Sequence, residues 1–220
     1  MSTTFKVYSQ IKILPSFNAV LSLCNKYLRE SLKKHDVNKS FIIDVRIQKN
    51  ETHEIISFDK ANPVIWSDDE YAWFVITGQP GGCDAYYRII DDLDIDCWND
   101  VFTYNERARK IEPQMRKCLD TGFYWYFRRS AGQPAIISLS YGLIAAAFAE
   151  LINGFIFSDD GAWDYDIFPA TARCFLQDYF DPQYPNPEHA DWAKKCINII
   201  KHAWTHLTFS GGFKPPLNVR

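Results

Sequence analysis

Aspartate clusters are the residues of this sequence whose types and spacing could do chemistry. Four aspartates follow the most apolar run of the chain in GFIFSDDGAWDYD, at Asp159, Asp160, Asp164 and Asp166. A calcium-binding EF-hand loop needs acids that alternate before its glycine and a distant Glu, and this stretch has neither. Carboxylates can also activate water beside a metal ion, so a metal-assisted hydrolase is the alternative that these clusters leave open.

Two further aspartate clusters lie earlier in the chain. SDDEY contains Asp68 and Asp69, and IIDDLDIDCWND contains Asp91, Asp92 and Asp94. A glycosidase needs two carboxylates that face one another across the substrate, and nothing in this spacing shows such a pair. We therefore assign these clusters no catalytic role.

Other patterns that carry chemistry are incomplete. His202 and His206 stand four residues apart on an expected helix, but the HExxH signature of zinc proteases is absent. SLSYG lacks the first glycine of a nucleophile elbow, and GQPGG is not a phosphate-binding loop. The sequence predicts no catalytic residue, no metal ligand and no cofactor, and we expect that the protein is not an enzyme.

The charge of the chain is unevenly divided. The net charge is −3, yet residues 59–100 hold ten acids against Lys60 and Arg88, and residues 158–191 hold eight acids against Arg173. Both acidic blocks mix Asp with Trp and Tyr. Such blocks are either solvated loops, where Asp favours turns and helix caps, or a docking surface that attracts a basic partner.

The docking interpretation predicts which side chains contact the partner. Aromatic residues among carboxylates supply contact area, and a nuclease has a basic cleft that such a surface would fit. The same charge argues against nucleic acid as the partner. In the competing structural interpretation, Asp159 bonds backbone amides, Gly161 takes a left-handed turn and Trp163 packs into the core. The predicted partner-binding residues are Asp68, Asp69, Asp91, Asp92, Asp94, Trp98, Asp159, Asp160, Trp163, Asp164 and Asp166.

The composition indicates a globular protein. Of the 220 residues, 47% are hydrophobic and 23% charged, so a large core can form. We expect one domain over 1–220 with a loose tail from about residue 209. The first residues lack an apolar signal-peptide core and the six cysteines are scattered, so we expect reduced thiols and a cytoplasmic protein.

The elements that must position these residues follow from periodicity. The run 134–157 is long enough to cross a bilayer, but Ser138, Glu150 and Asn153 favour a buried central helix followed by a short strand. Strands dominate the first half and helices the second, which predicts an α+β fold with helices on one face of a mainly antiparallel sheet. We expect helices over 17–34, 105–120 (kinked or split at Pro113), 168–180 and 187–208, strands over 39–48, 53–59, 70–78 and 122–130, and a strand or short helix over 83–93.

One long stretch, YWYFRRSAGQPAIISLSYGLIAAAFAELINGFIFSDDGAWDY, resembles the immunity proteins of bacterial polymorphic-toxin and type VI secretion systems, and is most similar to the immunity protein 52 family. The resemblance spans residues 123–180, with weaker support from WSDDEYAWFV. It implies an α+β fold, a cytosolic location, no enzyme activity and a cognate toxin encoded next to this protein, often a nuclease. The residues that carry it are Ser158, Asp159, Asp160, Gly161, Trp163 and Asp164.

Overall fold

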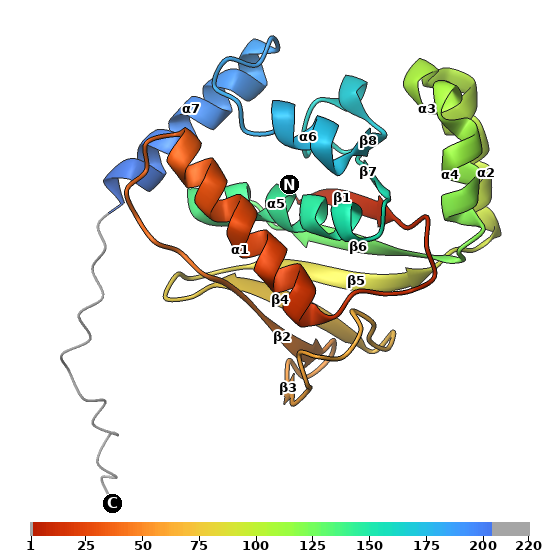
Figure 1. Ribbon diagram of the computed structural model, residues 1–220, viewed down its shortest axis with the longest axis horizontal. Helices are drawn as coiled ribbons and strands as arrows, with labels where there is room; N and C mark the ends of the chain where they lie inside the picture. The colour runs from red at the N-terminus through yellow and green to blue at the C-terminus, as the bar shows by residue number, and fades with distance from the viewer. Residues whose placement is uncertain (1, 204–220) are drawn as a thin grey trace, which may run out of the picture.

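The computed structural model describes residues 2–203, which form an antiparallel sheet in the order β3-β2-β4-β5-β6-β1-β7-β8 with helices packed against it (Figure 1). The predicted α+β class is confirmed. The predicted loose tail from residue 209 and His206 lie outside the described residues. The strands are β1 (Thr3–Tyr8), β2 (Ile43–Lys49), β3 (Ile55–Ile56), β4 (Glu70–Ile76), β5 (Cys83–Ile89), β6 (Phe123–Arg129), β7 (Phe155–Phe157) and β8 (Ala170–Thr171). The helices are α1 (Phe17–Lys34), α2 (Asp92–Tyr104), α3 (Glu106–Lys110), α4 (Glu112–Leu119), α5 (Ala135–Leu151), α6 (Ala172–Asp178) and α7 (Pro187–His202), with a short 3-10 helix η1 (Tyr165–Ile167).

The first helix begins where the sequence predicts. The Ser16 hydroxyl accepts a hydrogen bond from the Ala19 amide, which satisfies one of the free N–H groups at a helix start. Its buried residues recur at helical spacing from Phe17 to Leu32, so one stripe of α1 faces the core.

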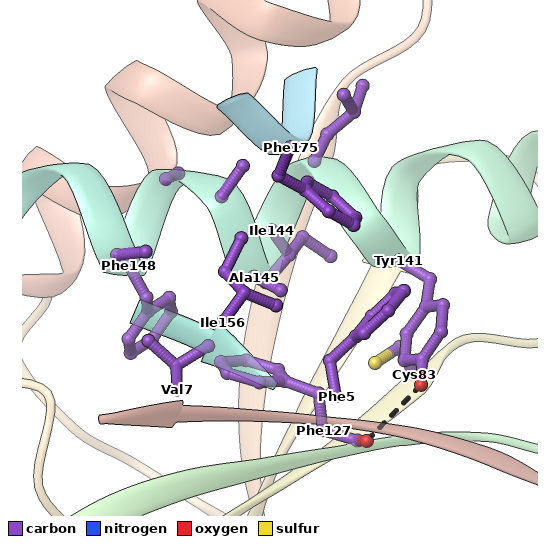
Figure 2. Packing of buried hydrophobic residues seen from close by; sticks show 14 of the residues in the cluster. Phe5, Val7, Cys83, Phe127, Tyr141, Ile144, Ala145, Phe148, Ile156 and Phe175 are labelled. Carbon is purple, nitrogen blue, oxygen red and sulfur yellow. Dashed lines mark hydrogen bonds between the residues drawn. The ribbon is translucent and has the colours of Figure 1, made fainter. Parts of the chain in front are cut away.

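The central helix α5 is buried on almost all sides. It lies between the sheet and α1, α6 and α7, and Figure 2 shows its side chains directed at β1 and β6. Tyr141 stacks on Phe5 with ring centroids 4.6 Å apart, and Phe148 packs edge-on against Phe127 at 4.9 Å. The helix also approaches α6 closely, because a Cβ atom on Gly142 would lie 2.3 Å from the Tyr179 ring. Within residues 2–203, no helix has both the length and the apolar character needed to cross a bilayer.

Besides the short elements η1 and β8, two elements were not predicted from the sequence. Residues 3–8 form β1, which pairs with β6 on one side and β7 on the other, near the middle of the sheet. Residues 92–104, expected as an acidic loop, form α2. The α2 helix lies over one end of the sheet face opposite α5, where Trp98 packs on Tyr8 and Phe157 at 5.2 and 4.8 Å between ring centroids.

Other elements differ from the prediction in their bounds. The expected helix over 105–120 is split at Ile111 into α3 and α4, and Pro113 lies in the first turn of α4, where its missing N–H costs nothing. The expected strand 53–59 contracts to the two residues of β3. The expected helix 168–180 begins only at Ala172, after the cis peptide bond between Phe168 and Pro169, with Thr171 as its cap.

Candidate functional site

The loop that joins β7 to η1 holds the first predicted aspartates in place. Asp160 accepts hydrogen bonds from the Thr4 amide at 3.1 Å, the Thr4 hydroxyl at 2.6 Å and the Ser158 hydroxyl at 3.2 Å. Asp159 is exposed, accepts no hydrogen bond from residues 2–203, and lies 3.9 Å from the Lys6 ammonium. Asp160 therefore anchors this loop to β1, whereas Asp159 is available at the surface.

The second acidic cluster caps a helix. Asp91 accepts a hydrogen bond from the Asp94 amide at 2.9 Å, and Asp94 accepts one from the Asp91 amide at 3.3 Å. This reciprocal capping box satisfies two amides at the start of α2, and the negative charges also favour a helix N-terminus. Asp92 is exposed in the same first turn.

The remaining predicted aspartates are held by local hydrogen bonds. The exposed Asp69 accepts from the Ser67 hydroxyl at 2.6 Å, and this bond lowers the pKa of Asp69. Asp164 accepts from the Asp166 amide at 3.3 Å and from the Asn186 side chain at 3.2 Å, while Asp166 is exposed. Asp68 is exposed as well, beside Asp69.

Two predicted partner-binding residues are instead core residues. Trp98 is 2% exposed and Trp163 is 1% exposed, so neither presents area to a partner, and the prediction is wrong for both. Trp98 fills the space between α2 and the sheet, and Trp163 packs against Tyr179 and His189 with ring centroids 5.1 and 4.7 Å apart. For Trp163 the structural interpretation holds, and Gly161 takes the expected left-handed turn with φ +79°.

A different set of aromatic residues, Trp73, Tyr86 and Tyr126, is partly accessible on the side of the sheet that faces away from α5. Residues alternate between the two faces of a strand, so this side collects every second residue of β4, β5 and β6. The α2 helix covers only the end near β1 and β7, and the uncovered part, which we call the open face, carries Tyr71, Trp73, Asp84, Tyr86, Arg88, Tyr126 and Arg128.

The open face is built from rows of paired residues that cross the strands. In one row, Asp84 of β5 lies opposite Trp73 of β4 and Arg128 of β6. In the next row, Tyr86 lies opposite Tyr126, and the Tyr86 ring stacks against Tyr71 with centroids 5.9 Å apart. Direct cross-strand neighbours of this kind fix one another's positions.

These rows border a groove of about 650 Å³, which we call the open-face groove. Its volume falls in the range of about 300–1,000 Å³ that is usual for ligand pockets. Asn50, His53 and Ser130 complete its lining.

An ion pair lies in the groove. The Arg128 guanidinium donates to one Asp84 oxygen through Nε at 2.7 Å and also through Nη2. Desolvation opposes the charge of Arg128, but the hydrogen bond and attraction from Asp84 outweigh it and raise the pKa of Arg128. Because the Asp84 carboxylate compensates the Arg128 guanidinium in this ion pair, the pair adds no net charge to the groove.

A second arginine gives the groove its net charge. The Arg88 guanidinium lies 5.3 Å from the centroid of the Tyr86 ring, and Arg128 lies 5.9 Å from the same ring, so both are within cation–π range. Burial raises the pKa values of Tyr71, Tyr86 and Tyr126, and their hydroxyls stay protonated and neutral. Arg88 is thus a positive charge that Asp84 does not neutralise.

Tyr71 is oriented by a chain of hydrogen bonds. Its hydroxyl donates to Gln48 Oε1 at 2.5 Å, and His53 Nδ1 lies 2.9 Å from the same hydroxyl. Because the single proton of Tyr71 is directed at Gln48, His53 Nδ1 acts as the donor to Tyr71. These two hydrogen bonds fix the position of the Tyr71 hydroxyl.

The aspartate clusters lie around the open face. Thr4, which Asp160 binds, is opposite Arg128 on β6, and Lys6, which approaches Asp159, is opposite Tyr126. At the other end of the strands, the Tyr124 hydroxyl donates to Asp94 at 3.4 Å. Asn50 lines the groove and donates to the Asp68 carbonyl at 2.8 Å, which places the third cluster at the edge. The structure therefore brings together three acidic loops that the sequence keeps far apart.

Sequence reasoning missed the open face itself. The signal was present as period-two alternation in EYAWFVI, CDAYYRI and FYWYFRR, which places Trp73, Tyr86 and Arg128 on one side and Tyr87 and Arg129 on the other. The sequence does not show which side the helices cover. Among residues 2–203, no group of three His, Cys, Asp or Glu side chains could hold a metal ion.

No protein-family model, curated protein or solved structure matches this chain. The resemblance to the immunity protein 52 family accordingly stays a prediction.

Proposed function

We propose that this protein is a cytoplasmic immunity protein that binds and neutralises a toxin protein through the open face and the acidic loops around it. One observation carries the proposal: a sheet face with the partly exposed Trp73, Tyr86 and Tyr126 is left without a covering helix, although the opposite face of the same strands is buried. Accessible Tyr and Trp side chains on a rigid sheet are typical of the centre of a protein–protein interface.

Charge supports a basic protein as the partner. Asp68, Asp69, Asp91, Asp92 and Asp159 are exposed in the three loops that border the open face. Carboxylates at the rim of an interface accelerate encounter with a cationic partner and exclude anionic ones. A polynucleotide is disfavoured by the same charges, whereas a nuclease with a basic cleft fits them.

The alternative of a metal-assisted hydrolase finds less support. Asp91, Asp94 and Asp160 accept hydrogen bonds from backbone amides, and Asp164 caps the η1 helix. Carboxylates in these positions stabilise the fold, and their lone pairs point at amides of this chain.

Co-expression with the gene that adjoins this one tests the proposal. We expect a one-to-one complex on affinity purification and loss of the toxin's activity in a growth or nuclease assay. Tyr86→Ala should weaken the complex, whereas Tyr104→Ala, at a position 84% exposed on α2, should not. No complex and no protection, with a folded protein by circular dichroism, would contradict the proposal.

A further inference from the structure

The open-face groove differs in charge from the loops around it. Residues 59–100 hold only two bases, Lys60 and Arg88. The Lys60 ammonium lies 2.5 Å from Asp44 and is paired there. Arg88 is exposed, forms no ion pair with any residue from 2 to 203, and lies over Tyr86 in the groove. The one unpaired base of this acidic block is therefore at the groove.

The groove offers donors and no competing free carboxylate. Asp84, its one acid, is occupied by Arg128. The Tyr86 ring lies beside Arg88, and the neutral hydroxyl of Tyr126 and the amide of Asn50 line the same groove. A guanidinium with neutral donors nearby is suited to a carboxylate, which can accept two parallel N–H bonds from arginine.

We propose that the open-face groove receives a carboxylate side chain of the partner protein, and that basic side chains next to that carboxylate contact the acidic loops. This inference rests on the proposed partner-binding function and specifies the chemistry of the partner segment. A positive centre within a negative rim favours a partner segment that carries both acidic and basic side chains. A polyanion would gain attraction at Arg88 and meet repulsion from Asp91, Asp92 and Asp159.

A peptide titration tests the inference without the toxin. The probe is the end-blocked tripeptide Lys-Glu-Lys, and its matched control is Lys-Gln-Lys, which has the same shape without the carboxylate. The readout is the indole N–H signal of Trp73, which lines the groove and is identified by comparison with Trp73→Phe. We expect the glutamate peptide to bind at least about tenfold more tightly than the glutamine peptide, because the glutamine peptide cannot form the charge-assisted hydrogen bond with Arg88.

Substitutions of Arg88 test whether the peptide binds at this residue. Arg88→Glu and Arg88→Gln should each weaken glutamate-peptide binding by about tenfold or more. The matched control is Arg29→Glu, an equal charge change at an exposed position of α1 on the other side of the sheet, and it should bind as the unaltered protein does. Equal binding of the two peptides, or unchanged binding by both folded Arg88 variants, would overturn the inference. A single-stranded oligonucleotide that bound more tightly than the glutamate peptide would also overturn it.

The same variants separate this inference from the proposed function when the toxin is present. Arg88→Glu should lower the affinity of the complex by about tenfold or more, and Arg29→Glu should leave it unchanged. A complex that forms equally well with Arg88→Glu would overturn the carboxylate site and leave the immunity function standing. A peptide response without any toxin complex would support the site and contradict the immunity function.

Discussion

The two faces of the central sheet are made from the same strands and differ in what their side chains can do. On the covered face, Phe5, Trp125 and Phe127 are fully buried against α5. On the open face, Trp73, Tyr86 and Tyr126 are half-buried and end in polar groups or stand beside charges. Alternate residues of one strand therefore pack into the core on one side and are available to bind a partner on the other.

This difference shows why the aromatic content of the chain does not by itself indicate function. Phenylalanine and alanine dominate where α5 meets the sheet, because an apolar side chain leaves no buried polar atom without a partner. Tyrosine and arginine dominate on the open face, where water or a ligand can satisfy their polar atoms. The two faces differ in which of them carries hydroxyl and guanidinium groups, more than in the number of their aromatic rings.

The largest expected effect is on the covered face. Phe148→Ala should lower the free energy of unfolding by about 3–5 kcal/mol, because the fully buried ring leaves a cavity. Trp73→Ala on the open face should lower it by less than about 2 kcal/mol, since that ring is only partly buried. Urea denaturation followed by circular dichroism measures both. Equal losses would show that the open face is part of the core.

The next effect separates two neighbouring aspartates at the edge of the open face. Asp160→Ala should lower the free energy of unfolding by about 1–3 kcal/mol, because the buried Thr4 amide loses its acceptor. Asp159→Ala removes only an exposed pair with Lys6 and should change stability by less than about 0.5 kcal/mol. Thermal unfolding of the two variants provides the comparison, and the reverse ranking would contradict the anchoring role of Asp160.

A kinetic effect sharpens the role of the acidic loops. Association with a basic partner should slow by about tenfold as salt rises from about 0.05 to 0.5 M, because the charges at the rim become screened. Dissociation should change less, since the buried centre of the interface is screened weakly. Stopped-flow measurements of the complex give both rates. An association rate that does not depend on salt would show that the acidic loops do not accelerate the encounter with the partner.

The smallest expected effect concerns His35, at the end of α1 on the covered side. Burial and then the charge of Lys34 lower the pKa of His35 below 6.5, while Asp181 opposes this shift. The unfolded chain then binds the proton more readily than the folded protein, so stability is full above about pH 6.5 and decreases as the pH falls through the lowered folded-state pKa. His35→Gln should remove this part of the decrease between about pH 7 and 5. Identical pH profiles for the variant and the unaltered protein would contradict it.

The sequence predicted the helices and strands that are determined by residues close together in the chain. Ser16 caps α1 through its own hydroxyl, and the apolar run from Ala135 to Leu151 forms a helix wherever it is buried. It did not reveal β1, because that strand is defined by pairing with Phe123–Arg129, more than a hundred residues away. Nor did it reveal α2, whose capping aspartates resemble a solvated acidic loop until the Asp91 and Asp94 amides are seen to be satisfied.

The candidate site was predicted only in part, for a related reason. The acidic loops are visible as charge, and the structure places them around one surface. Trp98 and Trp163 looked suited to an interface because they stand among aspartates, yet both side chains point inward. Whether a ring is buried depends on which helix covers which sheet face, and that is settled by packing between distant segments.

Side-chain oxidation of the complex tests most directly the claim that the open face binds the partner. Hydroxyl radicals label accessible rings, and mass spectrometry gives the labelling rate of each residue in the free and the bound protein. Binding should protect Trp73, Tyr86 and Tyr126 and leave Tyr104, near the C-terminal end of α2, unchanged. Protection of Tyr104 with no change at Trp73 and Tyr86 would place the partner elsewhere and contradict the account.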